Sequence, residues 1–151
     1  MTLYEFLEII HQAYQPRSYL EIGVSTGASL GLSRARTIAI DPAFKITSEI
    51  HCNVQVVKAT SDDFFARADG LAHFSDERID LAFVDGLHLF EFALRDFINV
   101  ERHADWTSVI VVDDVLPRNV AEASRERGTM VAWTGDVFKM VEVLARHRPD
   151  L

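Results

Sequence analysis

Five short apolar runs, each followed by a segment with helical patterning, constrain the fold of this chain more than any other feature. Continuous apolar runs of this length are typical of strands that are buried on both faces of a parallel sheet. Their alternation with helical segments predicts an α/β fold with a doubly wound, mostly parallel sheet. The predicted strands are residues 18–24, 37–42, 54–57, 79–86 and 108–114.

Helices are expected before the first strand and after each of the five strands. Leu3, Phe6, Leu7 and Ile10 recur at helical spacing, and Thr2 is suited to cap the helix that they form. The later helices are expected at residues 28–34, 43–51, 62–68, 88–100, 118–126 and 136–147. No repeat, low-complexity tract or linker interrupts this order, so we expect a single domain over residues 1–151.

The composition of the chain limits the classes of molecule that it is expected to bind. The net charge of −8 disfavours nucleic acid as the main partner, because phosphate backbones are bound by lysine and arginine surfaces. No apolar run approaches the ~20 residues of a membrane span, and the N-terminus lacks the pattern of a signal peptide. Cys52 is the single cysteine, which excludes an internal disulfide framework. We therefore expect a cytoplasmic protein with a small-molecule partner and no membrane partner.

The segment Tyr19–Ser29 has the strand–turn–helix layout of a nucleotide cradle. Gly23 and Gly27 stand four residues apart and Ser25 takes the middle position, so the dinucleotide fingerprint G-x-G-x-x-G is absent. Glycine permits the positive φ angles of a tight turn, and amides at a helix start can approach a ligand. Cofactor contacts are expected at Glu21, Gly23, Ser25, Thr26, Gly27 and Ser29.

Further cofactor contacts are expected where the second and third strands end, because ligands of such sheets bind at the carboxyl ends of the strands. Asp41 lies twenty residues beyond Glu21, where an acid commonly reaches the ribose hydroxyls of a nucleotide. Ser61 and Asp62 are suited to line an adenine pocket. A plain turn at Asp41 and a helix cap at Ser61 are the alternative interpretations.

Three acids and a histidine follow the fourth and fifth strands, which are expected to be neighbours. Asp85, Asp113 and Asp114 converge there, and several carboxylates together suit a hard cation such as Mg²⁺. Asp85 also faces the cofactor side. His88, three residues after Asp85, is placed to act as a general base. The alternative is that Asp85 and Asp114 cap helices or turns and His88 lies in solvent.

These segments resemble the class I S-adenosylmethionine (SAM) methyltransferases, in the branch called methyltransferase family 24. The resemblance rests on residues 21–29, 39–42, 83–88 and 112–117. The last two segments also resemble metal-dependent O-methyltransferases that act on catechols and macrolide sugars. The resemblance implies a Rossmann-like fold, SAM as methyl donor, Mg²⁺ on Asp85, Asp113 and Asp114, and His88 as base. The acceptor would be a small hydroxylated molecule.

The C-terminal part departs from this superfamily. Its members normally add strands six and seven as an antiparallel hairpin, and no such pattern follows the helix expected at residues 136–147. We therefore expect an open edge at the fifth strand and a homo-oligomer that covers it. Trp133 is expected to pack on the core, or to form a wall beside the substrate. The remaining histidines are expected at the surface: His11, His51, His73, His103 and His147.

Two other functions remain open on the sequence. An NAD-dependent oxidoreductase is disfavoured, because the chain lacks both G-x-G-x-x-G and a Tyr-x-x-x-Lys pair. A catalytically degenerate methyltransferase-like domain that only binds ligands is favoured by the absent hairpin. It is disfavoured by the retention of the glycine turn and the acidic loops.

Overall fold

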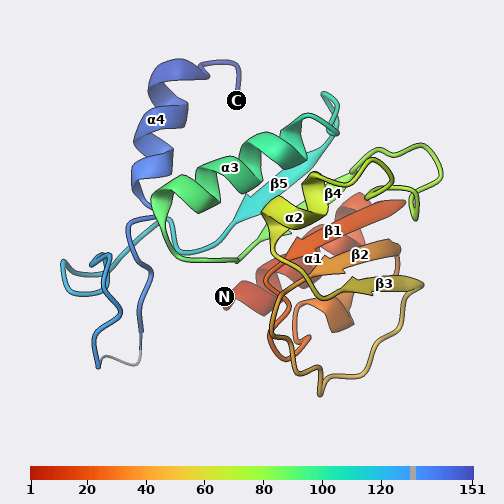
Figure 1. Ribbon diagram of the computed structural model, residues 1–151, viewed down its shortest axis with the longest axis horizontal. Coiled ribbons are helices and arrows are strands. Elements are labelled where there is room, and N and C mark those ends of the chain that lie inside the picture. The colour runs from red at the N-terminus through yellow and green to blue at the C-terminus, as the bar shows by residue number, and fades with distance from the viewer. Residues whose placement is uncertain (130–131) are drawn as a thin grey trace.

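The computed structural model describes residues 1–129 and 132–151, which are arranged around one five-stranded sheet (Figure 1). Every pair of neighbouring strands is parallel, and the strand order is β3-β2-β1-β4-β5. The strands are β1 (Ser18–Ile22), β2 (Arg36–Ile40), β3 (Val54–Val57), β4 (Leu81–Val84) and β5 (Val109–Val112). All five strands and the doubly wound α/β fold are as predicted, with β1, β4 and β5 side by side.

Helices precede or follow the strands, and the first one begins as predicted. The Thr2 side chain accepts from the Glu5 backbone N–H, and the Glu5 carboxylate accepts from the Thr2 N–H. This capping box satisfies two amides that the first helical turn leaves free. The helices are α1 (Leu3–Tyr14), η1 (Leu30–Leu32, a 3₁₀ turn), α2 (Ser61–Phe65), α3 (Phe90–Glu101) and α4 (Lys139–His147).

The two faces of the sheet carry alternate residues of each strand, because successive side chains of a strand point in opposite directions. Tyr19, Leu81 and Phe83 pack with Leu7 of α1 on one face. The next residues along the strands form the other face, where α2 and α3 lie; its buried members include Leu20, Ile22, Ile38, Ile40, Ala82 and Val84. Helix α4 packs on α3 (Figure 1). The face on which a side chain lies therefore decides whether it can reach α2 and α3.

The prediction of a helix at residues 43–51 is wrong, because that segment is a loop. The backbone N–H of Lys45 donates to the Ser25 carbonyl at 2.9 Å, and that of Thr47 donates to the Thr26 carbonyl at 3.0 Å. These amides bind the glycine turn instead of a helix of their own. The apolar side chains of the loop, including Ile46, cover a small core that contains Val24. Tertiary contacts therefore outweigh helical patterning here.

Two other helices differ from expectation. Of the helix expected at 28–34, only the 3₁₀ turn η1 forms. The helix expected at 118–126 is replaced by turns. There the Asn119 side chain accepts from the N–H groups of Ala121 and Glu122, at 3.0 and 3.1 Å. Such local side-chain bonds compete with helical ones.

Strand β5 forms one edge of the sheet. It pairs with β4 alone, and all four of its residues are half-buried rather than buried. The described residues contain no strand beyond β5, which agrees with the absence of a predicted terminal hairpin. Within the same residues, no helix combines the length and apolar character needed to cross a membrane.

Candidate cofactor and metal site

Sheet hydrogen bonding carries the acidic loops to one edge of the sheet. The ladder continues one residue past each strand, with Asp41 N–H bound to Val57 O at 3.1 Å and Asp85 N–H bound to Ile22 O at 2.8 Å. Asp113 N–H binds the carbonyl that ends β4 in the same way, at 3.0 Å. Backbone hydrogen bonds therefore fix the main-chain positions of these acids, which lie together at the carboxyl ends of the strands.

A cavity of about 720 Å³ lies at this edge. It is bounded by the ends of β1 and β2, the loop that leads from β3 into α2, and the start of α3. The predicted site residues that line it are Gly23, Ser25, Asp41, Ser61, Asp62, Asp85, His88, Asp113 and Asp114. Four predicted cofactor residues do not line it: Glu21, Thr26, Gly27 and Ser29.

The glycine turn is held open to the cavity by left-handed backbone at three alternate positions. The φ angles are 91° at Gly23, 48° at Ser25 and 80° at Gly27. A Cβ on Gly23 would stand 1.8 Å from the Asp85 carbonyl oxygen, so only glycine fits there. Asp41 binds the turn from the other side, because its Oδ2 accepts from the N–H groups of Val24 and Ser25, each at 2.9 Å.

Glu21 lies on the α1 face of β1, opposite the cavity, because it alternates with Ile22 along the strand. It is fully buried, and its carboxylate accepts from Tyr19 Oη at 2.7 Å and from Ser29 Oγ at 2.8 Å. Burial raises the pKa of Glu21 to about 7. Glu21 and Ser29 therefore bind each other at the far end of the turn, outside the cavity lining.

Glu21→Gln is expected to change how stability depends on pH. In the wild type the folded pKa of Glu21, about 7, exceeds that of an unfolded glutamate. The folded state therefore binds more protons than the unfolded state at pH values between these two pKa values. The stabilisation that this pKa difference gives to the folded state is complete below the unfolded pKa and is lost as pH rises through 7. Urea unfolding at pH 5 and pH 8 should show that the wild type loses about 2.5 kcal/mol more than the variant. The other titrating groups are common to both proteins, and parallel profiles would contradict the assignment.

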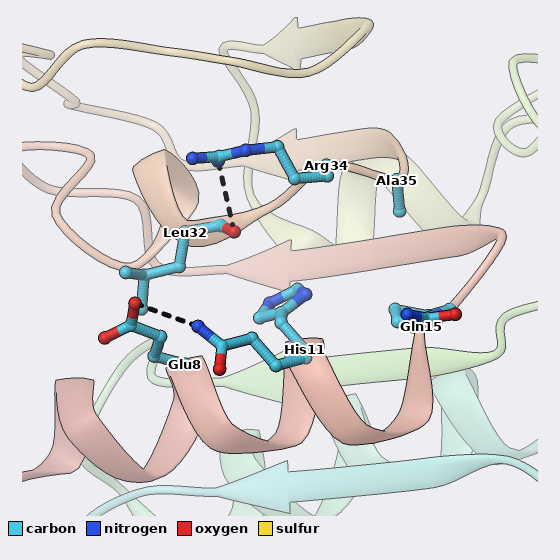
Figure 2. Close-up of a pocket in the computed structure, with 8 residues that line it drawn as sticks. Glu8, His11, Gln15, Leu32, Arg34 and Ala35 are labelled. Carbon is cyan, nitrogen blue, oxygen red and sulfur yellow. Dashed lines mark hydrogen bonds between the residues drawn. The ribbon is translucent and has the colours of Figure 1, made fainter.

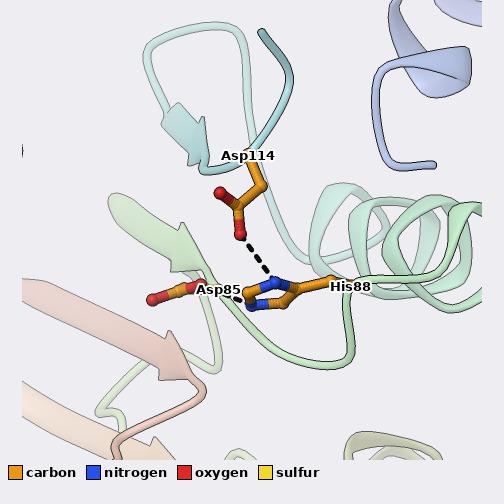
Figure 3. A group of neighbouring side chains, drawn as sticks. All are labelled: Asp85, His88 and Asp114. Atoms are coloured by element: carbon orange, nitrogen blue, oxygen red, sulfur yellow. Dashed lines mark ion pairs between the residues drawn. The ribbon is translucent and has the colours of Figure 1, made fainter. Parts of the chain in front are cut away.

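A cluster of three side chains lies where β4 and β5 end (Figure 3). His88 Nδ1 is 2.9 Å from Asp114 Oδ2, and His88 Nε2 is 3.4 Å from Asp85 Oδ1. One ligand atom from each residue lies within 4.8 Å of the others, which is a spacing suited to one metal ion. Asp114 has a φ of 61°, and strained backbone of this kind is common where a side chain must be aimed.

The histidine of this cluster is enclosed by a loop that precedes α4. His88 Nδ1 is 2.8 Å from the Trp133 carbonyl oxygen, and the two rings are stacked with centroids 5.1 Å apart. The interaction with Asp114, and to a smaller extent the one with Asp85, raises the pKa of His88 to about 10. Asp113, which was predicted as a ligand, is outside the cluster, and its Oδ1 accepts from the Asp114 N–H at 2.9 Å.

Comparison with known proteins decides the family. A protein-family model described as a methyltransferase domain, of family 24, matches residues 20–115. The chain belongs to this methyltransferase family. The matched span contains the glycine turn, the loop after β4 and the first three residues after β5, and the family uses SAM as methyl donor. The search against curated proteins returned no match.

The cavity of this methyltransferase also contains an acid that the sequence analysis missed. Asp96 lies on α3, is only 3% exposed and lines the cavity. Burial raises the pKa of Asp96 to about 6. Its signal in the sequence is its position, because it interrupts the buried stripe formed by Ala93, Phe97 and Val100. A carboxylate within such a stripe requires a polar partner.

A second cavity, of about 470 Å³, lies at the opposite edge of the sheet, before β1 and β2 (Figure 2). His11 and Arg34 line it from α1 and from the loop before β2. The prediction of His11 as a surface residue is wrong, because it is 9% exposed and stands edge-on to Tyr19. Burial lowers the pKa of His11 to about 4. The predicted cofactor and metal residues all lie outside this cavity.

Proposed function

We propose that this methyltransferase moves the methyl group of SAM to an oxygen of a small hydroxylated molecule, with the help of a divalent cation. The observation that carries the proposal is the cluster of Asp85, His88 and Asp114 at the cavity that the glycine turn also borders. A metal site and a basic side chain beside a methyl donor suit the activation of a hydroxyl group.

The proposed SAM contacts follow from the cavity lining. Gly23 and Ser25 present the backbone of the turn, Asp41 lies at the end of β2 for the ribose, and Ser61 and Asp62 lie at the base of α2 for adenine. Asp85 completes this wall at the end of β4. The residues behind the turn support its shape: Glu21, Thr26, Gly27 and Ser29. The space that a Cβ on Gly23 would fill fits a closely approaching ligand.

The donor set of the cluster fits a hard cation such as Mg²⁺. Asp85 and Asp114 supply carboxylate oxygens, and Asp113 lies beside them at the cavity. Burial and the neighbouring carboxylates of Asp85 and Asp114 raise the pKa of Asp113, so a positive ion in this place would relieve their repulsion. Such an ion would lower the pKa of an acceptor hydroxyl.

We assign His88 as the base. The carboxylates that raise its pKa, those of Asp114 and Asp85, are the proposed metal ligands, so a cation bound to them would lower this pKa and favour the neutral ring. Its Nδ1 faces the Trp133 carbonyl, which can only accept a hydrogen bond, so the proton of the neutral ring is held there. Nε2 is then the atom that takes the acceptor's hydroxyl proton. The acceptor oxygen forms a bond to the methyl carbon as the carbon–sulfur bond breaks, and the sulfonium leaves as neutral S-adenosylhomocysteine. The chain contributes mainly orientation and charge neutralisation.

The remaining parts of the proposal concern partners. The net charge of −8 supports a small-molecule acceptor over a nucleic acid or a membrane surface. We infer one methyltransferase domain over residues 1–151 and a cytoplasmic location. The open edge of β5 supports a homo-oligomer, because unpaired strand edges favour pairing. The second candidate function is that of a domain that binds SAM without turnover, and it is favoured by the same open edge.

Calorimetric titration of S-adenosylhomocysteine into the purified protein tests the proposed function. We expect micromolar binding in EDTA, and tighter binding or a separate heat when Mg²⁺ is present in excess. NAD is the matched ligand control and should give no heat. Absence of S-adenosylhomocysteine binding in both buffers would contradict the proposal. Binding that persists without any effect of Mg²⁺ would contradict metal assistance and favour the non-catalytic domain.

A further inference from the structure

We propose that two copies of this chain pair through the open edges of β5, antiparallel and centred on Val111, into one continuous sheet. The inference rests on the homo-oligomer of the proposed function and gives that oligomer an interface and a register. In this arrangement Trp106 of each copy lies beside the end of β5 in the other copy, close to the loop that carries its Asp113 and Asp114.

The open edge of β5 presents backbone groups that are ready to pair (Figure 1). Among the described residues, β5 pairs with β4 alone. The N–H groups of Val109 and Asp113 donate to carbonyls on the β4 side, at 2.9 and 3.0 Å. Backbone groups alternate in direction along a strand, so those of Ile110 and Val112 point away from β4 toward the open edge.

The side chains of this edge favour pairing as well. Exposed strand edges are commonly protected by charged side chains, proline or a bulge, whereas β5 has the sequence Val-Ile-Val-Val and is half-buried throughout. A hollow of about 820 Å³ lies beside the edge, between β5, α3 and α4. Its apolar lining residues include Ile110, Val112, Val115, Met140 and Leu144. An apolar edge beside such a hollow is suited to receive a strand with β-branched side chains.

The outward backbone groups select one register. Residues that face each other in an antiparallel pair can exchange both of their hydrogen bonds. A two-fold axis through Val111 places Ile110 of each copy opposite Val112 of the other, so that every outward group of β5 is used. A register shifted toward the start of β5 would need the Ser108 N–H, which already donates within its own turn at 3.0 Å. A register shifted the other way would need Asp114, whose φ of 61° departs from strand geometry.

The exposed apolar residues beside β5 agree with this register. Trp106 is 94% exposed and Leu116 is 83% exposed, and they lie five residues before and five residues after Val111. The two-fold axis therefore brings Trp106 of each copy toward Leu116 of the other. Burial of both tryptophans would supply about a third of the ~1,200 Å² that small stable interfaces bury. The paired strands and the walls of the two hollows supply the remaining contact.

Cysteine cross-linking tests the register, in a Cys52→Ser background that removes the single native thiol. Across the axis the two Val111 Cα atoms would lie about 4.5 Å apart, within the reach of a disulfide. We therefore expect Val111→Cys to form a covalent dimer on oxidation with diamide, seen on a non-reducing gel. Ile110→Cys is the matched control, because its two copies would lie about 7–8 Å apart on the diagonal and should not cross-link.

Sedimentation velocity at micromolar concentration tests the association itself. The wild type is expected to be a dimer, and Trp106→Ala is expected to weaken the association by about 10-fold or more. Ile9→Ala is the control, because Ile9 is 54% exposed on α1, away from the β5 edge, and should associate as the wild type does. Thermal melts establish that each variant is folded, and Trp106→Ala decides the matter if a cysteine variant is not.

Four results would each overturn the inference: a monomeric wild type, no cross-link in Val111→Cys, a cross-link in Ile110→Cys, or wild-type association in Trp106→Ala. None of these measurements uses SAM. Calorimetric titration of S-adenosylhomocysteine into the same samples therefore reports on the proposed function separately, and its failure would leave the interface standing.

Discussion

Gly23→Ala is expected to lower the free energy of unfolding by about 3 kcal/mol or more and to abolish binding of S-adenosylhomocysteine. The new Cβ would stand 1.8 Å from the Asp85 carbonyl oxygen, and the backbone there has a φ of 91°. Both problems can be relieved only by moving the turn away from β4. Urea unfolding measures the loss of stability, and calorimetry measures the loss of binding.

Gly128→Ala is the matched control for this substitution. A Cβ at Gly128 would meet no atom within 4 Å, and the residue is exposed. Its free energy of unfolding should stay within about 0.5 kcal/mol of wild type. Wild-type stability and wild-type affinity in Gly23→Ala would mean that the turn is not packed against β4 as described.

Asp85→Asn and Asp114→Asn are each expected to weaken Mn²⁺ binding by about 100-fold or more. Mn²⁺ stands in for Mg²⁺ because it takes the same oxygen ligands and is detected by electron paramagnetic resonance. Each variant removes a carboxylate charge from the cluster that holds His88. Methyl transfer, measured as release of S-adenosylhomocysteine over a panel of catechols and sugars, should fall in parallel with metal binding.

Asp113→Asn distinguishes the ligand set expected from the sequence from the set that the structure groups together. Asp113 is outside the three-residue cluster, so its substitution should weaken Mn²⁺ binding less than that of Asp85 or Asp114. Asp69→Asn, at an exposed position outside both the cavity lining and the cluster, should leave metal binding unchanged. Equal Mn²⁺ affinity in Asp85→Asn, Asp114→Asn and wild type would contradict the metal site.

The glycine turn and the cluster of Asp85, His88 and Asp114 are connected through packed backbone. Gly23 packs against the backbone of Asp85, and Asp85 in turn pairs with His88. Gly135 makes a similar close approach, because a Cβ there would lie 1.6 Å from the His88 carbonyl oxygen. A larger side chain at either glycine would therefore displace His88, although neither glycine has a reactive side chain.

The sequence allowed much of this site to be predicted, for a physical reason. In a parallel sheet, strand order and direction bring the carboxyl ends of β1, β2, β4 and β5 together, and an acid at a strand end must follow its strand. Asp41, Asp85 and Asp114 therefore needed only correct strand assignments to be placed at the cavity. The glycine turn was predictable because left-handed backbone at Gly23 excludes other side chains.

Other features depended on contacts between distant segments. Ser29, which donates to the buried Glu21 carboxylate, is brought near it only by the glycine turn. Residues 43–51 have helical patterning, but their amides bind the glycine turn, because the turn offers carbonyls that are otherwise free. Periodicity within a segment carries no information about such partners.

By itself the sequence determined the doubly wound fold, the strands, the glycine turn and the acids at the strand ends, because these follow from local patterning and from the geometry of parallel sheets. Only the tertiary structure decided which side chains meet. It grouped His88 with Asp85 and Asp114, turned Glu21 away from the cavity and placed Asp96 in the cavity wall. The meeting of Asp114 with His88 and the place of Asp96 at the cavity depend on packing between elements far apart in the chain, which no local pattern encodes.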